Sequence, residues 1–303
     1  MRIVRLLLIM LMSCIVYIAC YVFVIDKPIT IGIKQDYFAR KTAYLAGLRS
    51  PKIVLLAGSN GRFSHRCETR EQETGIGCAN MSIAAGMARS YQFDNNKPYL
   101  GRGDLVYLPL EYAQYRRSKL QVMAGEDAPY IVAYDKQYLL KLNMEHLLNT
   151  LFYADLRYFL SAVGEMLMHN MNMRQRYSVD DLTTQGDESG HAGQKAASYS
   201  EYIRSTRWNK PLISDFQASD FGTRTLVEFM NWASSKGILV VGGLPTTFND
   251  EPLPHELVRK ICSFYQSHGH AFIKLGNNSQ FPREQFFDSP NHLQEPYQVS
   301  HSQ

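Results

Sequence analysis

The sequence predicts an α/β fold with a mostly parallel sheet covered on both faces, a helical insertion and an N-terminal transmembrane helix. Short uninterrupted apolar runs at 53–57, 105–109 and 238–241 are typical of buried parallel strands. Segments with helical spacing alternate with these runs, as a parallel sheet requires. Residues 6–25 contain no charged side chain, and a membrane-spanning helix needs about 20 mostly apolar residues.

The flanks of the apolar N-terminal segment indicate its orientation. Arg2 and Arg5 precede it, and the positive-inside rule then puts the N-terminus in the cytoplasm and the rest outside. A cleaved signal peptide is the alternative, but the segment is long for one and lacks a clear small-x-small cleavage site. We therefore expect an uncleaved anchor at 1–25 in a single-pass protein of the bacterial inner membrane. Its C-terminal domain would lie in the periplasm.

Charge and cysteine usage restrict the partners and the compartment. The formal net charge is +4, and no dense Lys/Arg patch indicates a nucleic-acid partner. Cys67 and Cys78 flank a polar loop, and outside the cytoplasm such a pair can oxidise. Closing so short a loop would stabilise the fold by about 2–3 kcal/mol. Metal binding is the alternative, but no second cysteine pair or His-x-x-x-His motif lies nearby. We therefore expect no metal site.

The remaining chain is divided by its patterns into a linker region and one large domain. Residues 26–50 predict a linker and an amphipathic helix that ends near Gly47. The domain would occupy 51–303 and would carry a helical insertion at about 115–215, rich in Tyr, Leu, Met and Arg. This insertion could form a lid or a substrate wall. Helices at 223–235 and 256–268 and a strand at 271–275 complete the alternation.

A serine stands at the carboxyl end of the first predicted strand. Gly58, Ser59, Asn60 and Gly61 follow that strand, and two glycines allow a tight turn with positive φ. Ligands of open α/β sheets bind at this edge. Ser59 is a candidate nucleophile if a base lies close to it in space. The alternative is an ordinary turn after a strand.

A candidate base stands near the C-terminus. Asp288 precedes His292 by four residues in a Pro-bearing loop, which can bring the carboxylate to the imidazole. Asp288 would orient the ring and stabilise its protonated form, while His292 accepts the serine proton. The alternative is a surface loop with a local hydrogen bond. Together with Ser59 on one parallel sheet, the pair predicts nucleophilic catalysis that uses no cofactor.

The order of four sequence blocks carries a family resemblance. Gly58-Ser59-Asn60, the stretch from Asn80 to Gly86, Gly103-Asp104-Leu-Val-Tyr-Leu-Pro-Leu-Glu-Tyr and the terminal Asp288/His292 pair follow one another. In this order they resemble the SGNH (GDSL-like) hydrolase superfamily. Within this superfamily, the four blocks are most similar to the membrane-anchored branch, which is associated with acylation of exopolysaccharides and cell-wall polymers. The resemblance covers roughly 50–112 and 222–300.

The resemblance implies a flavodoxin-like three-layer fold and acyl-ester chemistry through a serine ester intermediate. Ser59 would be the nucleophile, His292 the base and Asp288 its partner. Backbone N–H groups of Ser59 and Gly86 would form much of the oxyanion hole, and one such donor is typically worth about 3–4 kcal/mol in the transition state. Asn80 opens the second block and is a candidate binding residue.

The chain departs from the family pattern at three places. Ala57-Gly58-Ser59-Asn60 replaces Gly-Asp-Ser-Leu, and Pro109-Leu110-Glu111 replaces the asparagine of the third block. Asp288 and His292 are four residues apart instead of three. A carboxylate at Glu111 would repel an oxyanion, so we expect it to point elsewhere or to bind a hydroxyl. Asn60 is a candidate replacement for the missing donor.

The resemblance implies that the protein is a serine-dependent O-acyl esterase or O-acetyltransferase. Its substrate would be an exported polysaccharide or acylated glycan in the biosynthesis of an exopolysaccharide such as cellulose, and its partners the membrane and a polysaccharide synthase or export complex. The missing asparagine favours an alternative, a catalytically silent polysaccharide-binding or scaffold subunit of such a complex. A lipase or thioesterase on small acyl esters is a third possibility.

Overall fold

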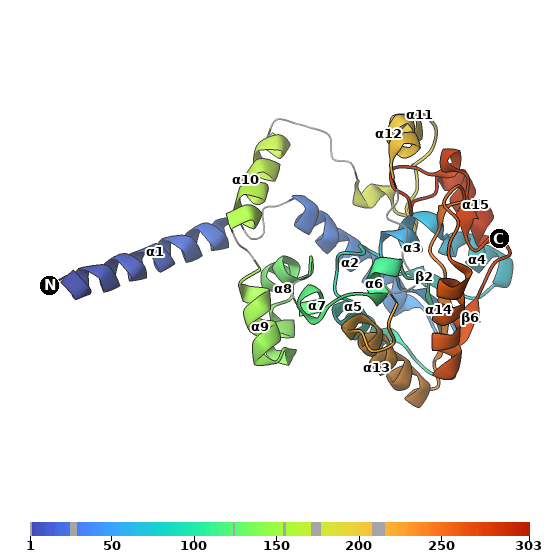
Figure 1. Ribbon diagram of the computed structural model, residues 1–303, viewed down its shortest axis with the longest axis horizontal. Coiled ribbons are helices and arrows are strands. Elements are labelled where there is room, and N and C mark those ends of the chain that lie inside the picture. The colour runs from blue at the N-terminus through green and yellow to red at the C-terminus, as the bar shows by residue number, and fades with distance from the viewer. Residues whose placement is uncertain (1, 25–28, 124, 154–155, 171–176, 208–215) are drawn as a thin grey trace. The chain divides into compact units, whose positions relative to one another are not determined.

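The computed structural model describes residues 2–24, 29–123, 125–153, 156–170, 177–207 and 216–303 (Figure 1). Contacts between its Cα atoms divide the chain into two compact units. One contains Met1–Asp36 and Met123–Ser178, and the other contains Tyr37–Val122 and Val179–Gln303. The second unit contains the sheet and every candidate site residue.

The central sheet of the second unit has five parallel strands in the order β2-β1-β3-β4-β6. This confirms the expected α/β fold with a mostly parallel central sheet. A small parallel pair, β5 and β7, lies apart from it. The strands are β1 (Ile53–Leu55), β2 (Cys78–Asn80), β3 (Leu105–Leu108), β4 (Leu239–Gly243), β5 (Thr247–Phe248), β6 (Ala271–Ile273) and β7 (Gln280–Phe281).

One face of the sheet forms the main hydrophobic core. Val54, Val106 and Val240 pair with one another across β1, β3 and β4 and are fully buried. The helices α5 (Arg89–Asn96) and α13 (Phe221–Ser235) contribute to this core, where Phe93 stacks on Phe229 with ring centroids 4.0 Å apart. Burial of these side chains is the main source of stability for the strands, which are too short to persist alone.

The opposite face is covered less completely than the sequence predicts. His65, at the end of α3 (Ser59–Ser64), lies with its ring 5.4 Å from that of Tyr107 in β3. Towards the other edge, Leu239 and Ile273 remain 48% and 49% exposed.

The remaining helices of this unit are α4 (Cys67–Thr74), α6 (Tyr112–Tyr115), α11 (Gly193–Ala197), α12 (Ser200–Ser205), α14 (His255–Ser267) and α15 (Glu295–Ser302), with 3₁₀ turns at Lys97–Tyr99, Val179–Asp181 and Arg283–Gln285.

Two strands end earlier than their apolar runs. In β1 the amide of Leu56 still donates to Tyr107 O, but the amide of Ala57 donates to Ser82 Oγ, which ends the ladder. The strand β3 ends before Pro109, whose ring nitrogen has no proton to donate. After β2, a turn through residues 84–87 precedes α5, which begins at Arg89.

The predicted disulfide is present. Cys67 at the start of α4 and Cys78 at the start of β2 are bonded, with Cα atoms 5.1 Å apart. The bond therefore fastens the segment that follows Ser59 to an edge strand of the sheet.

The regular secondary structure described for the first unit is all helical. It contains α1 (Arg2–Val24), α8 (Ala128–Tyr134), a 3₁₀ helix at Lys136–Lys141, α9 (Met144–Leu151) and α10 (Leu156–Asn170) (Figure 1). The helices α2 (Ile29–Gly47) and α7 (Lys119–Met123) cross from one unit into the other. Among the described residues, one helix is long and apolar enough to cross a membrane, at Arg2–Val22 in α1.

Candidate active site

The candidate nucleophile lies where the order of strands reverses. The chain leaves β1 for β2 on one side and then returns to β3 on the other side of β1. Ser59 begins α3 just after β1, and Glu111 follows β3. In open α/β sheets, ligands bind at the carboxyl ends of the strands beside such a reversal. The fold therefore places Ser59 and Glu111 together at a position suited to a ligand.

The two glycines of the serine turn provide space and not a left-handed backbone. Gly58 has a φ of −77°, and Gly61 is not among the positive-φ residues, so the expected positive φ is wrong. A Cβ atom on Gly58 would collide with the carboxylate of Glu111 and would lie 2.6 Å from Ala85 Cα. A Cβ on Gly61 would collide with the hydroxyl of Ser82. Close approach of neighbouring loops therefore explains both glycines.

Glu111 binds the backbone of the serine turn. Its two oxygens accept hydrogen bonds from the amides of Gly58 at 3.2 Å and Asn60 at 2.9 Å. The side chain is buried, and this desolvation raises the pKa of the Glu111 carboxyl, although the two amide hydrogen bonds partly oppose the shift. The carboxylate thus holds the residues on both sides of Ser59.

The amide of Asn60 is also engaged inside the protein. Its Nδ2 donates to Pro109 O at 3.0 Å, and its Oδ1 accepts from both the amide and the hydroxyl of Thr246, at 3.0 and 2.9 Å. Asn60 therefore links the ends of β1 and β3 to the loop after β4. This arrangement does not support the suggestion that Asn60 replaces the missing oxyanion donor.

Asp288 and His292 form the expected pair. His292 Nδ1 lies 2.6 Å from Asp288 Oδ1, and both side chains are buried. The amide of His292 donates to Ser289 O and the carbonyl of His292 accepts from Phe287 N, so the intervening loop is closed on itself. With the Nδ1 proton held by the carboxylate, Nε2 carries the lone pair that a general base needs.

The structure brings this pair to the helix that Ser59 begins. The His292 ring stacks on Phe63, with centroids 4.2 Å apart and planes inclined by 19°. Phe63 follows Ser59 by four residues, so the two side chains share one face of α3. Ser64 Oγ also donates to Asn291 O at 2.8 Å, which fastens the histidine loop to α3. No hydrogen bond joins Ser59 to His292 among the described residues; such bonds are often long before a substrate binds.

Asn80 supports the fold of the site through hydrogen bonds to three neighbouring segments. Its Nδ2 donates to Gly61 O and Asp187 Oδ1, both at 2.8 Å, and its Oδ1 accepts from Ser82 N. The residue is fully buried. Asn80 thus ties α3 to β2 and to the loop that contains Asp187, and its amide is engaged by groups inside the protein.

Gly86 lies in a turn that packs beside Gly58, since Ala85 is the neighbour that a Cβ on Gly58 would meet. The guanidinium of Arg117 donates to the carbonyls of Ala85, Gly86 and Met87. Three carbonyl groups of one turn are therefore held by a single side chain. The sequence offered no signal for Arg117 beyond its place shortly after the third block.

A buried lysine is a second feature that the sequence analysis missed. Lys41 Nζ donates to the carbonyls of Asn80, Ser82 and Gly186 at 2.7 to 2.9 Å. Burial lowers the pKa of Lys41 to about 7. Lys41 therefore joins α2, the end of β2 and the polar loop at 180–198.

The polar loop at 180–198 contributes to the surroundings of His292. The ring of His191 lies 5.2 Å from Phe63 and 5.6 Å from Phe287, next to the residues that flank the imidazole. Burial lowers the pKa of His191 to about 4, so this ring is neutral at neutral pH. Among the described residues, no group of three or more His, Cys, Asp or Glu side chains could hold a metal ion.

No protein-family model matches the chain, and no curated protein matches it.

Proposed function

We propose that the protein is a serine-dependent O-acyl esterase or O-acetyltransferase of the SGNH type that acts on an exported polysaccharide. The observation that carries the proposal is the stacking of His292 on Phe63. It supports the proposal because the imidazole that Asp288 binds contacts the helix α3, which Ser59 begins. Hydrogen bonds of Ser64 with Asn291 and Leu293, more than 220 residues away in sequence, support it further.

The reaction would proceed through a serine ester. Ser59 Oγ attacks the acyl carbonyl carbon while His292 Nε2 takes the hydroxyl proton, and Asp288 stabilises the imidazolium. The imidazolium then gives its proton to the departing sugar oxygen. In the second half, His292 takes a proton from water or from an acceptor hydroxyl, whose oxygen attacks the acyl carbon. As the bond to Ser59 breaks, the imidazolium returns this proton to Ser59 Oγ, which regenerates the free serine.

The oxyanion of the intermediate would be stabilised by backbone N–H groups of Ser59 and Gly86. Neither N–H donates a hydrogen bond in the described part of the chain. Arg117 holds the carbonyl groups of the turn that contains Gly86, which fixes its peptide planes before substrate binds. Preorganised donors of this kind are typically worth about 3–4 kcal/mol each in the transition state.

The topology supports the SGNH-type, flavodoxin-like fold. Numbered along the chain, the strands of the central sheet follow the order 2-1-3-4-5, which is the order of flavodoxin-like doubly wound sheets. Ser59 after the first strand and Glu111 after the third occupy the corresponding reversal point.

The location proposed for this site is the periplasmic side of a bacterial inner membrane, with α1 as a single-pass anchor. The apolar helix Arg2–Val22 and the positive charges of Arg2 and Arg5 support this orientation. The Cys67–Cys78 disulfide is typical of an oxidising compartment. A neighbouring polysaccharide synthase or export complex would supply the polymer.

The substitution Ser59→Ala tests the proposal. Turnover of an aryl acetate and release of acetate from an acetylated glycan should both fall by about 10³-fold or more, because no nucleophile remains. Ser235→Ala, at an exposed serine on α13, is the matched control and should retain activity. Unchanged turnover of both substrates by Ser59→Ala would remove Ser59 from the mechanism.

A catalytically silent scaffold or polysaccharide-binding subunit is the second candidate. Glu111 favours it, because a carboxylate stands where the family places an oxyanion donor and is committed to the backbone of the serine turn. A silent protein should not react with a fluorophosphonate probe, whereas an activated serine should.

A further inference from the structure

Exposed apolar side chains outside α1 gather on the helices of the first unit. In α9, Met144, Leu148 and Leu151 are exposed by 70%, 46% and 42%. Their spacing of four and three residues puts them on one face of the helix. Leu140, one turn before α9, is 89% exposed. Soluble surfaces rarely carry so continuous an apolar stripe without a partner.

The helix α10 repeats this arrangement. Leu156, Leu160 and Leu167 are exposed by 68%, 60% and 59%, and their spacing again places them on one face. Arg157 and Ser161 are exposed on another side of the same helix. The helix is therefore amphipathic, and its apolar side faces outward and not into a core.

Tyrosine rings locate α10 beside the end of the membrane-spanning segment. The rings of Tyr21 in α1 and Tyr158 in α10 have centroids 6.5 Å apart, and Tyr153 lies 6.4 Å from Tyr158. Tyrosines concentrate at the boundary between hydrocarbon and water because one end of the ring is apolar and the other polar. The start of α10 therefore lies at the level where α1 leaves the bilayer.

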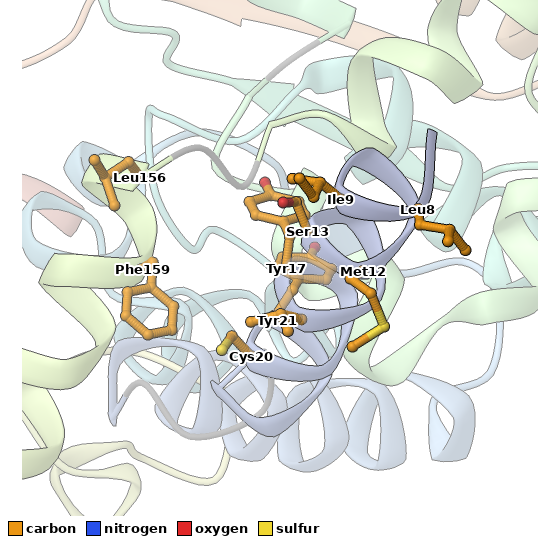
Figure 2. A pocket seen from close by; sticks show the side chains of 10 residues that line it. Leu8, Ile9, Met12, Ser13, Tyr17, Cys20, Tyr21, Leu156 and Phe159 are labelled. Atoms are coloured by element: carbon orange, nitrogen blue, oxygen red, sulfur yellow. The ribbon is translucent and has the colours of Figure 1, made fainter. Parts of the chain in front are cut away.

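An apolar groove continues from α1 onto α10 (Figure 2). Its volume is about 660 Å³, and its lining includes Met12, Tyr17 and Cys20 of α1 with Leu156 and Phe159 of α10. In a chain anchored by α1, this groove is open to lipid acyl chains and not to water. The lipid-facing surface of α1 and the apolar side of α10 are thus continuous.

We propose that Leu140, α9 and α10 form a membrane-interface patch, in which α9 and α10 insert their leucine faces into the leaflet where α1 emerges. The occupant of these faces is the boundary between headgroups and acyl chains of that bilayer, as for interfacial amphipathic helices. The proposal rests on α1 as the anchor and is independent of catalysis. It gives α9 and α10 a role as a second membrane attachment.

The test uses the full chain in nanodiscs of phosphatidylethanolamine and phosphatidylglycerol. Cys14, Cys20 and Cys262 are free and are first replaced by serine. Single cysteines are then introduced and coupled to an environment-sensitive fluorophore, and spin-labelled lipids are added as quenchers. The informative pairs are Leu160→Cys against Ser161→Cys and Leu148→Cys against Glu145→Cys, in which each control is exposed on the polar side of the same helix.

We expect several-fold stronger quenching and a blue-shifted emission at 148 and 160 than at 145 and 161. A label at Leu11→Cys reports separately on the anchor. Quenching at 11 with equal, weak quenching at both members of each pair would overturn the patch and leave the anchor intact. Self-quenching of the fluorophore that depends on the number of copies per disc, without lipid quenching, would assign the faces to a second copy and also overturn it.

Discussion

Phe63 and Asp288 contact His292 from two sides and together fix its ring. Asp288 accepts from Nδ1 at 2.6 Å, and the Phe63 ring lies parallel to the imidazole. Phe63 is fully buried, so its own position is fixed by packing. At the scale of single residues, the orientation of His292 thus depends on an aromatic side chain that has no chemical role.

The substitution Phe63→Leu should therefore affect turnover more than substrate binding. We expect kcat to fall by about 10-fold or more while KM changes little, because a small displacement of the base lowers the fraction of productive geometries. Phe93→Leu is the matched control, since Phe93 is buried and stacked on Phe229 away from the site. Equal losses of kcat in the two variants at equal stability would show that Phe63 does not position His292.

At the scale of elements, the site is held by contacts between segments that no local pattern connects. Lys41 of α2 binds carbonyls at the end of β2 and in the loop at 180–198. The carboxylate of Asp187 in that loop accepts hydrogen bonds from the amides of Cys67 and Glu68 at the start of α4. Each tie satisfies buried backbone groups that would otherwise lose their hydrogen bonds to water.

Replacement of Lys41 tests the strength of this tie. Lys41→Met should lower the free energy of unfolding by about 3 kcal/mol or more, because three buried carbonyls lose their donor. Lys236→Met, at an exposed lysine, should change it by less than about 0.5 kcal/mol. Denaturant unfolding measures both values, and a loss for Lys41→Met no larger than for the control would show that these hydrogen bonds contribute little.

The sequence predicts elements better than it predicts these ties. Apolar runs predict the strands to within a few residues. The turn at Gly58 and Ser59 lies shortly after β1, as the sequence predicts. The spacing of Asp288 and His292 predicted their hydrogen bond, because both partners lie in one loop. The sequence does not predict the roles of Lys41 and Arg117, because their partners are backbone carbonyls, which leave no pattern in the sequence. The sequence wrongly predicts a positive φ for the glycines of the serine turn, because their crowding by Glu111 arises only once the strands are in register.

At the scale of the whole molecule, buried histidines make stability depend on pH. The C-terminal helix α15 carries His301, whose ring lies 4.9 Å from that of His65. Burial is the main cause that lowers the pKa of His301 to about 4, and nearby Arg70 lowers it further. The folded protein therefore binds a proton at this site less readily than the unfolded chain does.

The sign of the effect follows from linkage. Between pH 6.5 and 4 the unfolded chain protonates His301 and the folded protein does not, so this group lowers the free energy of unfolding as the pH falls. The slope is at most about 1.4 kcal/mol per pH unit. Between pH 6.5 and 4, the wild type should lose free energy of unfolding relative to His301→Gln as the pH falls. Above pH 7, the difference between the two proteins should stay constant.

The exposed His255 provides the control for this experiment, because His255→Gln removes a histidine without changing the core. The stability difference from the wild type should change more with pH for His301→Gln than for His255→Gln. A difference for His301→Gln that stays flat across this interval would mean that His301 has the same pKa in the folded and unfolded states.

The most direct test of the central claim is covalent labelling of the purified full-length protein with a fluorophosphonate, followed by mapping of the modified residue. Such a probe reacts with a serine only when an adjacent base activates it. We expect stoichiometric labelling at Ser59, strongly slowed labelling in His292→Ala and none at that position in Ser59→Ala. A folded wild-type protein that stays unlabelled, or that is labelled equally in all three forms, would contradict the assignment of Ser59 and His292 to one catalytic site.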